Sequence, residues 1–142
     1  MTDSEYQEQK ERVQALAQEW VHRVGLGWWK IDLDWYREDF PPSADPRPLF
    51  QCVMRTLADW RYALATIQVN LPLVARYTDR ELELAIIHEL MHVFLHEMRE
   101  WTDDGHGVGH EERVATTLSK GFLWLKEFLT GEREDPVTEV VK

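Results

Sequence analysis

Apolar residues recur at the three- and four-residue spacing of an amphipathic helix in three separate stretches of this chain. The first stretch ends at Gly25 and the last ends before Gly131, because glycine favours the backbone conformation that terminates a helix. The middle stretch begins at Thr78 with Glu81 three residues later, which is the pattern of a capping box. The sequence therefore predicts helices over residues 4–24, 78–99 and 110–129.

Between the first two predicted helices, apolar and polar residues alternate in the manner of half-buried strands. Strands are predicted over Trp29–Trp35, Phe50–Ala58 and Tyr62–Val69, with loops at 41–48 and 101–109, where proline, or glycine and aspartate, accumulate. The order of helix, three strands, helix, loop and helix indicates an α+β domain. We expect a small antiparallel sheet of about three strands, packed against an N-terminal helix, the middle helix and a C-terminal helix.

The length of 142 residues predicts a single domain over 1–142, with flexible ends at 1–5 and 131–142. A net charge of -10 argues against nucleic acid or an anionic membrane as a partner. The single Cys52 cannot form an internal disulfide and fits a reducing compartment. The chain contains no long apolar run or signal-peptide pattern, so a soluble cytoplasmic protein is expected, while its oligomeric state is not indicated.

The middle helix contains His88-Glu89-Leu90-Met91-His92, in which two histidines lie one helical turn apart on one face. Two imidazoles at this spacing can hold one zinc ion, and Glu89 can accept a proton from water that the metal activates. Chance alone is expected to produce about 0.03 such matches in a chain of this composition. The surrounding helix is apolar nearly all round, so these polar side chains need a partner. We predict a Zn²⁺ site with His88 and His92 as ligands and Glu89 as general base.

A third protein ligand is expected, because zinc enzymes usually supply three and leave a fourth position for water. Extending the apolar stripe of the last helix back by one turn reaches Glu111, which is therefore the preferred ligand. Glu112, His106 and His110 are alternatives, whereas His96 lies about 12 Å along the helix from His88 and is too far away. The stripe consists of Val114, Ala115, Leu118, Phe122, Leu125 and Leu129.

The motif HELMH in a helix, with the strand ATIQVN before it and a helix beginning HEERVAT after it, resembles the HExxH zincin metallopeptidases over residues 62–125. The chain is most similar to short gluzincin-like domains, in which a glutamate on the next helix is the third ligand. Glu111 matches the ExxV form of that context and Glu112 the ExxA form. This resemblance implies that the strand Ala65–Asn70 forms the upper edge of the cleft and pairs with extended substrate.

A second resemblance is to SprT-like proteases, in which a loop histidine completes a three-histidine site. The segment Asp103-Asp104-Gly105-His106-Gly107 is similar to that loop. SprT-like proteins act at DNA, however, and the acidic chain fits that activity poorly.

The motif and the resemblance together predict a zinc metallopeptidase that acts on a peptide or protein substrate. The alternative is a non-catalytic or regulatory zincin-like module that binds one protein partner, as ImmA/IrrE-type regulators with the same motif do. A helical binding domain without metal is a third hypothesis. The identity of the substrate is not indicated by the sequence.

Overall fold

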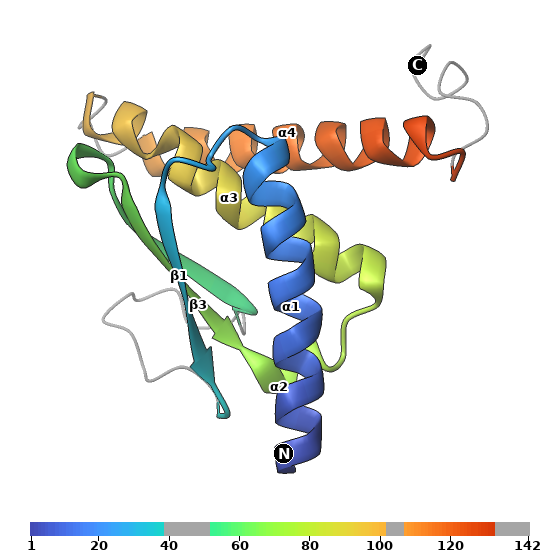
Figure 1. Cartoon of the computed structure of the whole chain (residues 1–142). Helices are drawn as coiled ribbons and strands as arrows, with labels where there is room; N and C mark the ends of the chain where they lie inside the picture. Colours follow the sequence, from blue (N-terminus) through green and yellow to red (C-terminus); the bar gives the residue numbers. More distant parts are fainter. Residues whose placement is uncertain (39–51, 102–106, 133–142) are drawn as a thin grey trace.

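The computed structural model describes residues 1–38, 52–101 and 107–132, and within these ranges the protein is an α+β domain with a three-stranded sheet. Figure 1 shows the strands side by side, α1 next to them, and α4 running along α3. The elements in chain order are α1 (Asp3–Arg23), β1 (Lys30–Tyr36), β2 (Met54–Asp59), the 3-10 helix η1 (Trp60–Tyr62), β3 (Leu64–Asn70), α2 (Leu71–Val74), α3 (Asp79–Trp101) and α4 (Gly107–Leu129).

The ends of the helices follow local capping signals. The backbone N–H of Glu81 donates to the Thr78 hydroxyl, and that of Thr78 donates to the Glu81 carboxylate, which confirms the predicted capping box of α3. A second capping box, between Thr2 and Glu5, starts α1 at Asp3, one residue before the predicted start at residue 4. The α4 helix ends before Gly131, as predicted, in a left-handed backbone conformation at that glycine.

Two predicted loops and the tail lie wholly or partly outside the described residues. These are 41–48, most of the segment 101–109, and 133–142. Within the segment 101–109, the structure starts α4 at Gly107, three residues before the predicted start at His110. Glycine costs only about 1 kcal/mol in a helix relative to alanine, and the packing of α4 on α3 overrides that preference.

The sheet is mixed, not antiparallel as predicted. Its strand order is β1-β3-β2, with β1 parallel to β3 and β2 antiparallel to β3. The short turn through η1, where Ala63 has a left-handed φ of 52°, makes β2 and β3 an antiparallel hairpin. Residues 37–63, which include β2, separate β1 from β3, and a connection of that length permits the parallel pairing of these two strands.

The strand β3 is the central strand, and this position overturns one implication of the zincin resemblance. Both edges of Ala65–Asn70 are hydrogen-bonded to neighbouring strands, so this segment has no free edge for a substrate. Within the described residues, the outer edge of β2 carries no further strand, and β2 packs against α3. Among the described strands, β2 is therefore the one beside α3 whose outer edge no described strand pairs.

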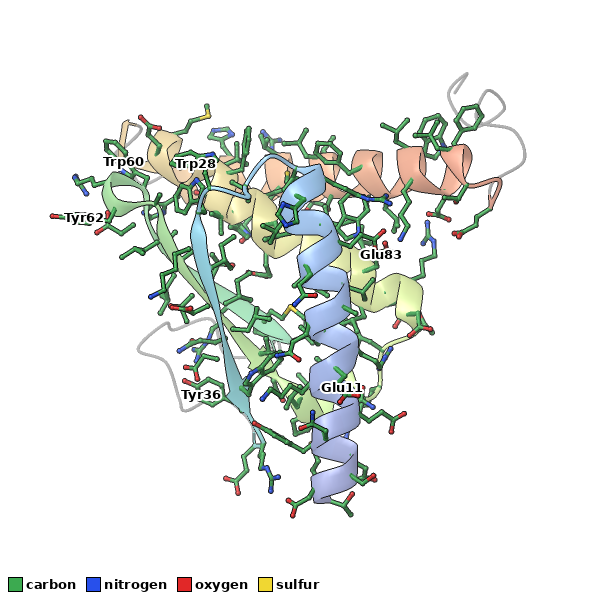
Figure 2. The ribbon with its side chains drawn as sticks, viewed as in Figure 1. Glu11, Trp28, Tyr36, Trp60, Tyr62 and Glu83 are labelled. Carbon is green, nitrogen blue, oxygen red and sulfur yellow. The ribbon has the colours of Figure 1, made fainter. Side chains whose placement is uncertain are left out.

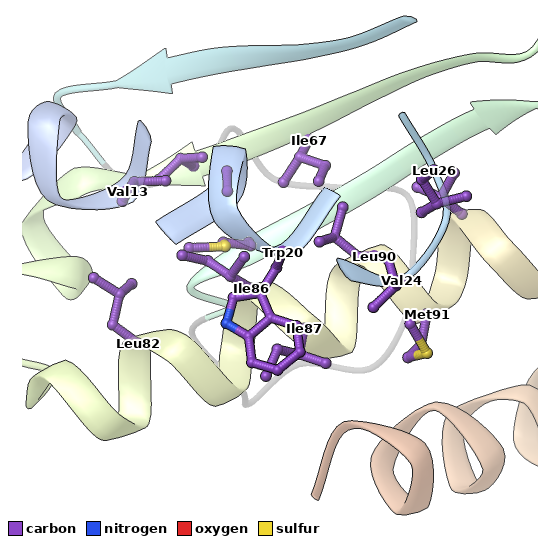
Figure 3. Packing of buried hydrophobic residues seen from close by; sticks show 14 of the residues in the cluster. Val13, Trp20, Val24, Leu26, Ile67, Leu82, Ile86, Ile87, Leu90 and Met91 are labelled. Atoms are coloured by element: carbon purple, nitrogen blue, oxygen red, sulfur yellow. The ribbon is translucent and has the colours of Figure 1, made fainter. Parts of the chain in front are cut away.

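The core lies between the sheet and the two long helices α1 and α3. Figure 3 shows Val13 and Trp20 of α1 packed with Ile67 of β3 and with Ile86 and Leu90 of α3. All five side chains are almost completely buried. The burial of these side chains stabilises the fold and holds α3, which carries the HELMH motif, against the sheet.

The buried face of α4 differs from the predicted apolar stripe. Val114, Leu125 and Leu129 are exposed, although the periodicity of the sequence places them in the core. Because α4 packs along α3, it buries a ridge of residues spaced by four, which is a common contact geometry between helices. The ridge consists of Glu111, Ala115, Ser119, Leu123 and Glu127.

Candidate metal centre

The two histidines of the HELMH motif meet a glutamate of α4 at the interface between α3 and α4. The Nε2 atoms of His88 and His92 lie 3.0 Å apart. The Glu112 carboxylate places one oxygen 3.0 Å from Nε2 of His92 and the other 3.3 Å from Nε2 of His88. One donor atom from each of these three residues lies within 4.8 Å of the other two, so the group could hold a single metal ion.

Two residues of α4 hold the opposite edges of the imidazole rings. The buried carboxylate of Glu111 lies 2.7 Å from Nδ1 of His92, and the hydroxyl of Thr116 lies 3.5 Å from Nδ1 of His88. An acceptor at Nδ1 favours the tautomer in which Nδ1 carries the proton and Nε2 carries the lone pair. Glu111 therefore orients His92 so that its Nε2 faces the other donors.

The charge distribution of the group fits a cation. When Nδ1 of His92 donates to Glu111, the Nε2 atom of His92 carries a lone pair. A carboxylate oxygen of Glu112 lies 3.0 Å from this Nε2 atom. Two such electron-rich atoms repel each other unless a positive centre lies near both. Burial, followed by the neighbouring His92, lowers the pKa of His88, so the neutral, metal-binding form of its imidazole predominates at neutral pH. Two imidazoles with one carboxylate form a donor set that is typical of catalytic zinc sites.

Glu89 is buried beside this group, and a strand residue holds its carboxylate. The hydroxyl of Thr56, on the inner face of β2, donates to Oε2 of Glu89 at 2.5 Å. Burial raises the pKa of Glu89 to about 7, although the hydrogen bond from Thr56 acts in the opposite direction. A carboxyl group with a pKa near neutrality can take up and release a proton at physiological pH, as a general acid or base must.

Metal-free protein is expected to lose stability as the pH rises from 4.5 to about 7, because Glu89 must then ionise inside the fold. The folded state keeps this proton up to a pH of about 7, whereas the unfolded chain releases it near 4.5, so ionisation in this window favours unfolding. A Glu89→Gln variant cannot ionise and should be more stable than the wild type by about 3 kcal/mol at about pH 8. The two proteins should be equally stable below about pH 4.

Urea unfolding in the presence of a chelator measures this difference. A Glu97→Gln variant is a suitable control, since Glu97 is exposed on the same helix two turns further on. Equal stability of the Glu89→Gln variant and the wild type at about pH 8 would contradict the desolvated environment of Glu89.

The structure brings together five candidate site residues but gives the two glutamates of α4 different places. His88, Glu89 and His92 lie together as the motif predicts, while Glu112, not the preferred Glu111, shares the space between the Nε2 atoms. Glu111 belongs to the buried ridge of α4, whose residues are spaced by four, so it lies within the packed interface with α3. Glu112 is half-exposed and lies at the rim of that interface.

Of the alternative third ligands, His110 and His106 remain, and two threonines, Thr56 and Thr116, also contact the site. The ring of His110 is exposed and contacts Arg113 at 3.1 Å, and His106 lies outside the described residues. Sequence reasoning did not identify Thr56 or Thr116 as neighbours of the site. The only sequence signal for Thr116 is its spacing of one helical turn from Glu112, and Thr56 has no local signal, because its contact depends on how β2 packs on α3.

Comparison with protein-family models, with curated proteins and with solved structures finds no match to this chain. In the described part of the chain, no helix has both the length and the apolar character needed to cross a bilayer.

Proposed function

We propose that this protein is a zinc-dependent metallopeptidase with a zincin-like arrangement of its site. The observation that carries the proposal is the convergence of His88, His92 and Glu112 beside a buried carboxyl group, Glu89, whose pKa is near neutrality. A site that only stored a metal would not require a proton acceptor next to its ligands.

In the proposed site, His88, His92 and Glu112 hold the zinc ion, and Glu111 orients His92. When bound, zinc lowers the pKa of water and polarises the carbonyl group of a substrate. The proximity of the three donor atoms supports this assignment, since each of them lies within 4.8 Å of the other two.

Glu89 is proposed to act as the general base. It takes a proton from the attacking water and returns it to the nitrogen of the leaving amine as the peptide bond breaks. The hydrogen bond from Thr56 occupies Oε2, which leaves Oε1 as the proton acceptor and restricts rotation of the carboxylate. The half-buried Thr56 lies on the free edge strand β2, so the same strand can align an extended peptide beside Glu89 through backbone hydrogen bonds.

The test of this function is metal-dependent cleavage. Zinc-loaded protein is expected to cleave members of a fluorogenic peptide library, a chelator should reduce the rate to background, and added zinc should restore it. Elemental analysis of protein purified without added zinc reports the metal content in parallel. A metal-to-chain ratio near zero that added zinc does not raise would contradict the proposal.

A second candidate is a non-catalytic zincin-like module that binds a protein partner, and one observation favours it. Figure 2 shows Trp28, Trp60 and Tyr62 at the same end of the molecule, where the backbone N–H of Lys30 bonds to the carbonyl of Ala63. Trp28 and Tyr62 are 74% and 72% exposed, and exposed aromatic rings are typical of binding surfaces. Such a module would melt at a lower temperature without zinc but would cleave no peptide of the library.

A further inference from the structure

One side of α4 carries an apolar stripe that the described part of the chain buries only in part, with Leu118 at the border of the core. Val114, Leu125 and Phe128 are 44%, 45% and 42% exposed, Leu118 is half-buried, and Gly121 is exposed. The five positions are separated by four, three, four and three residues, which is the heptad spacing of a coiled-coil seam. We call these five residues, from Val114 to Phe128, the α4 stripe.

The α4 stripe lies on a different side of the helix from the ridge that packs on α3. The aromatic rings of Trp124 and Phe128 stack with their centroids 5.6 Å apart and their planes almost parallel, and Leu129, next to them, is 73% exposed. A continuous apolar surface of this kind is characteristic of an interface between proteins. Periodicity alone places Val114 and Leu125 in the core because residues that are buried in an interface between proteins have the same spacing as core residues.

Gly121, at the centre of the stripe, has no packing role within the described part of the chain. A Cβ atom added to Gly121 would meet no described heavy atom within 4 Å. Glycine in a helix interior costs about 1 kcal/mol relative to alanine, so internal packing does not account for its presence in α4. Close approach of the backbone of another helix does account for it, since only glycine leaves that space open.

The charges along the stripe suit a second copy in the antiparallel direction. The segment from Arg113 to Lys126 contains no acidic residue, although the chain has a net charge of -10, and of its three basic residues Lys126 is already paired with Glu19 and Glu83. Two copies of this face therefore meet without repulsion between carboxylates. Antiparallel pairing about Gly121 brings Val114 of one copy opposite Phe128 of the other. It also brings Arg113 toward the C-terminal end of the other α4, where the helix dipole is negative and Glu132 follows.

We propose that two copies of this protein associate through an antiparallel pairing of their α4 stripes centred on Gly121. The contact from Val114 to Phe128 extends over about 21 Å of helix, which is short for a standard-size interface. A contact of this size is typical of a reversible association, so the dimer is expected to dissociate on dilution. This proposal does not depend on the metal site, so it stands or falls independently of the proposed function.

Sedimentation equilibrium from about 1 µM to about 500 µM, with and without zinc, tests the proposal. The wild type is expected to shift from the mass of one chain toward that of two. Gly121→Gln and Leu125→Glu should each weaken association at least about tenfold, the first by blocking close approach and the second by burying a charge. The matched control is Lys120→Gln, an exposed position on the same helix outside the stripe, which should associate like the wild type.

Circular dichroism at low concentration checks that every variant folds. Gly121→Gln is the variant with the lowest risk of misfolding, because the space around a Cβ atom at position 121 is open and glutamine favours a helix. A wild type that keeps the mass of one chain at every concentration would overturn the proposal and leave the stripe to a different protein. A dimer that persists unchanged in folded Gly121→Gln and Leu125→Glu would overturn it as well.

Discussion

A Glu89→Gln variant is expected to retain zinc and to hydrolyse peptides about 10²- to 10⁴-fold more slowly than the wild type. Glutamine has nearly the same shape and can still accept the hydrogen bond from Thr56 through its carbonyl oxygen, but it cannot accept a proton from water. The expected loss is in kcat, because the proton is transferred in the transition state and contributes little to substrate binding.

The measurement is kcat and KM for a fluorogenic peptide that the wild type cleaves, together with zinc content by elemental analysis. Glu97→Gln is the matched control, since it removes an exposed carboxylate from the same helix and should leave both parameters unchanged. Wild-type activity in the Glu89→Gln variant would remove Glu89 from the mechanism. Loss of zinc from this variant would instead assign the carboxylate to metal binding.

Zinc affinity is expected to fall by more than about 100-fold in Glu112→Ala and by about 10- to 100-fold in Glu111→Ala. Glu112 lies beside the Nε2 atoms of both histidines, so its removal deletes a proposed ligand. Glu111 acts on the opposite edge of His92, so its removal loosens the orientation of the ring without removing a donor. A Glu111→Gln variant, which keeps an acceptor for Nδ1, should retain most of the affinity.

Competition with a chromophoric chelator gives the zinc affinities of the wild type and the three variants directly. Thr117→Ala is a suitable control, because Thr117 is exposed on α4 and lies outside the site. The reverse order, with the larger loss in Glu111→Ala, would restore Glu111 as the third ligand that the apolar periodicity of the sequence predicts. Each variant should be compared at the same pH, because protons compete with zinc for the histidines.

The comparison between Glu111 and Glu112 shows where reasoning from the sequence reached its limit. The periodicity of α4 correctly indicates that Glu111 is buried, and burial of a carboxylate correctly indicates that it has a partner. It does not indicate whether that partner is a metal ion or the far side of a histidine. That distinction depends on how α4 is rotated about its own axis against α3, which is a property of the pair of helices.

The sheet gives a second example of the same limit. Alternation locates the strands β1 and β3 closely, because the two-residue period is a local property of the chain. The direction and order of pairing are not local, so neither the parallel pairing of β1 with β3 nor the central position of β3 was predicted. The contact between Thr56 and Glu89 has the same origin, since it requires β2 at the edge of the sheet next to α3.

By itself, the sequence determined the α+β class, the helix that carries His88, Glu89 and His92, and the capped ends of α3 and α4, because periodicity and capping act over a few neighbouring residues. The tertiary structure decided which glutamate lies beside the Nε2 atoms of both histidines, which described strand is the sheet edge next to α3, and which apolar residues of α4 stay exposed. These features depend on contacts between segments far apart in the chain, and the free energy of packing the whole domain selects among alternatives that are locally equivalent.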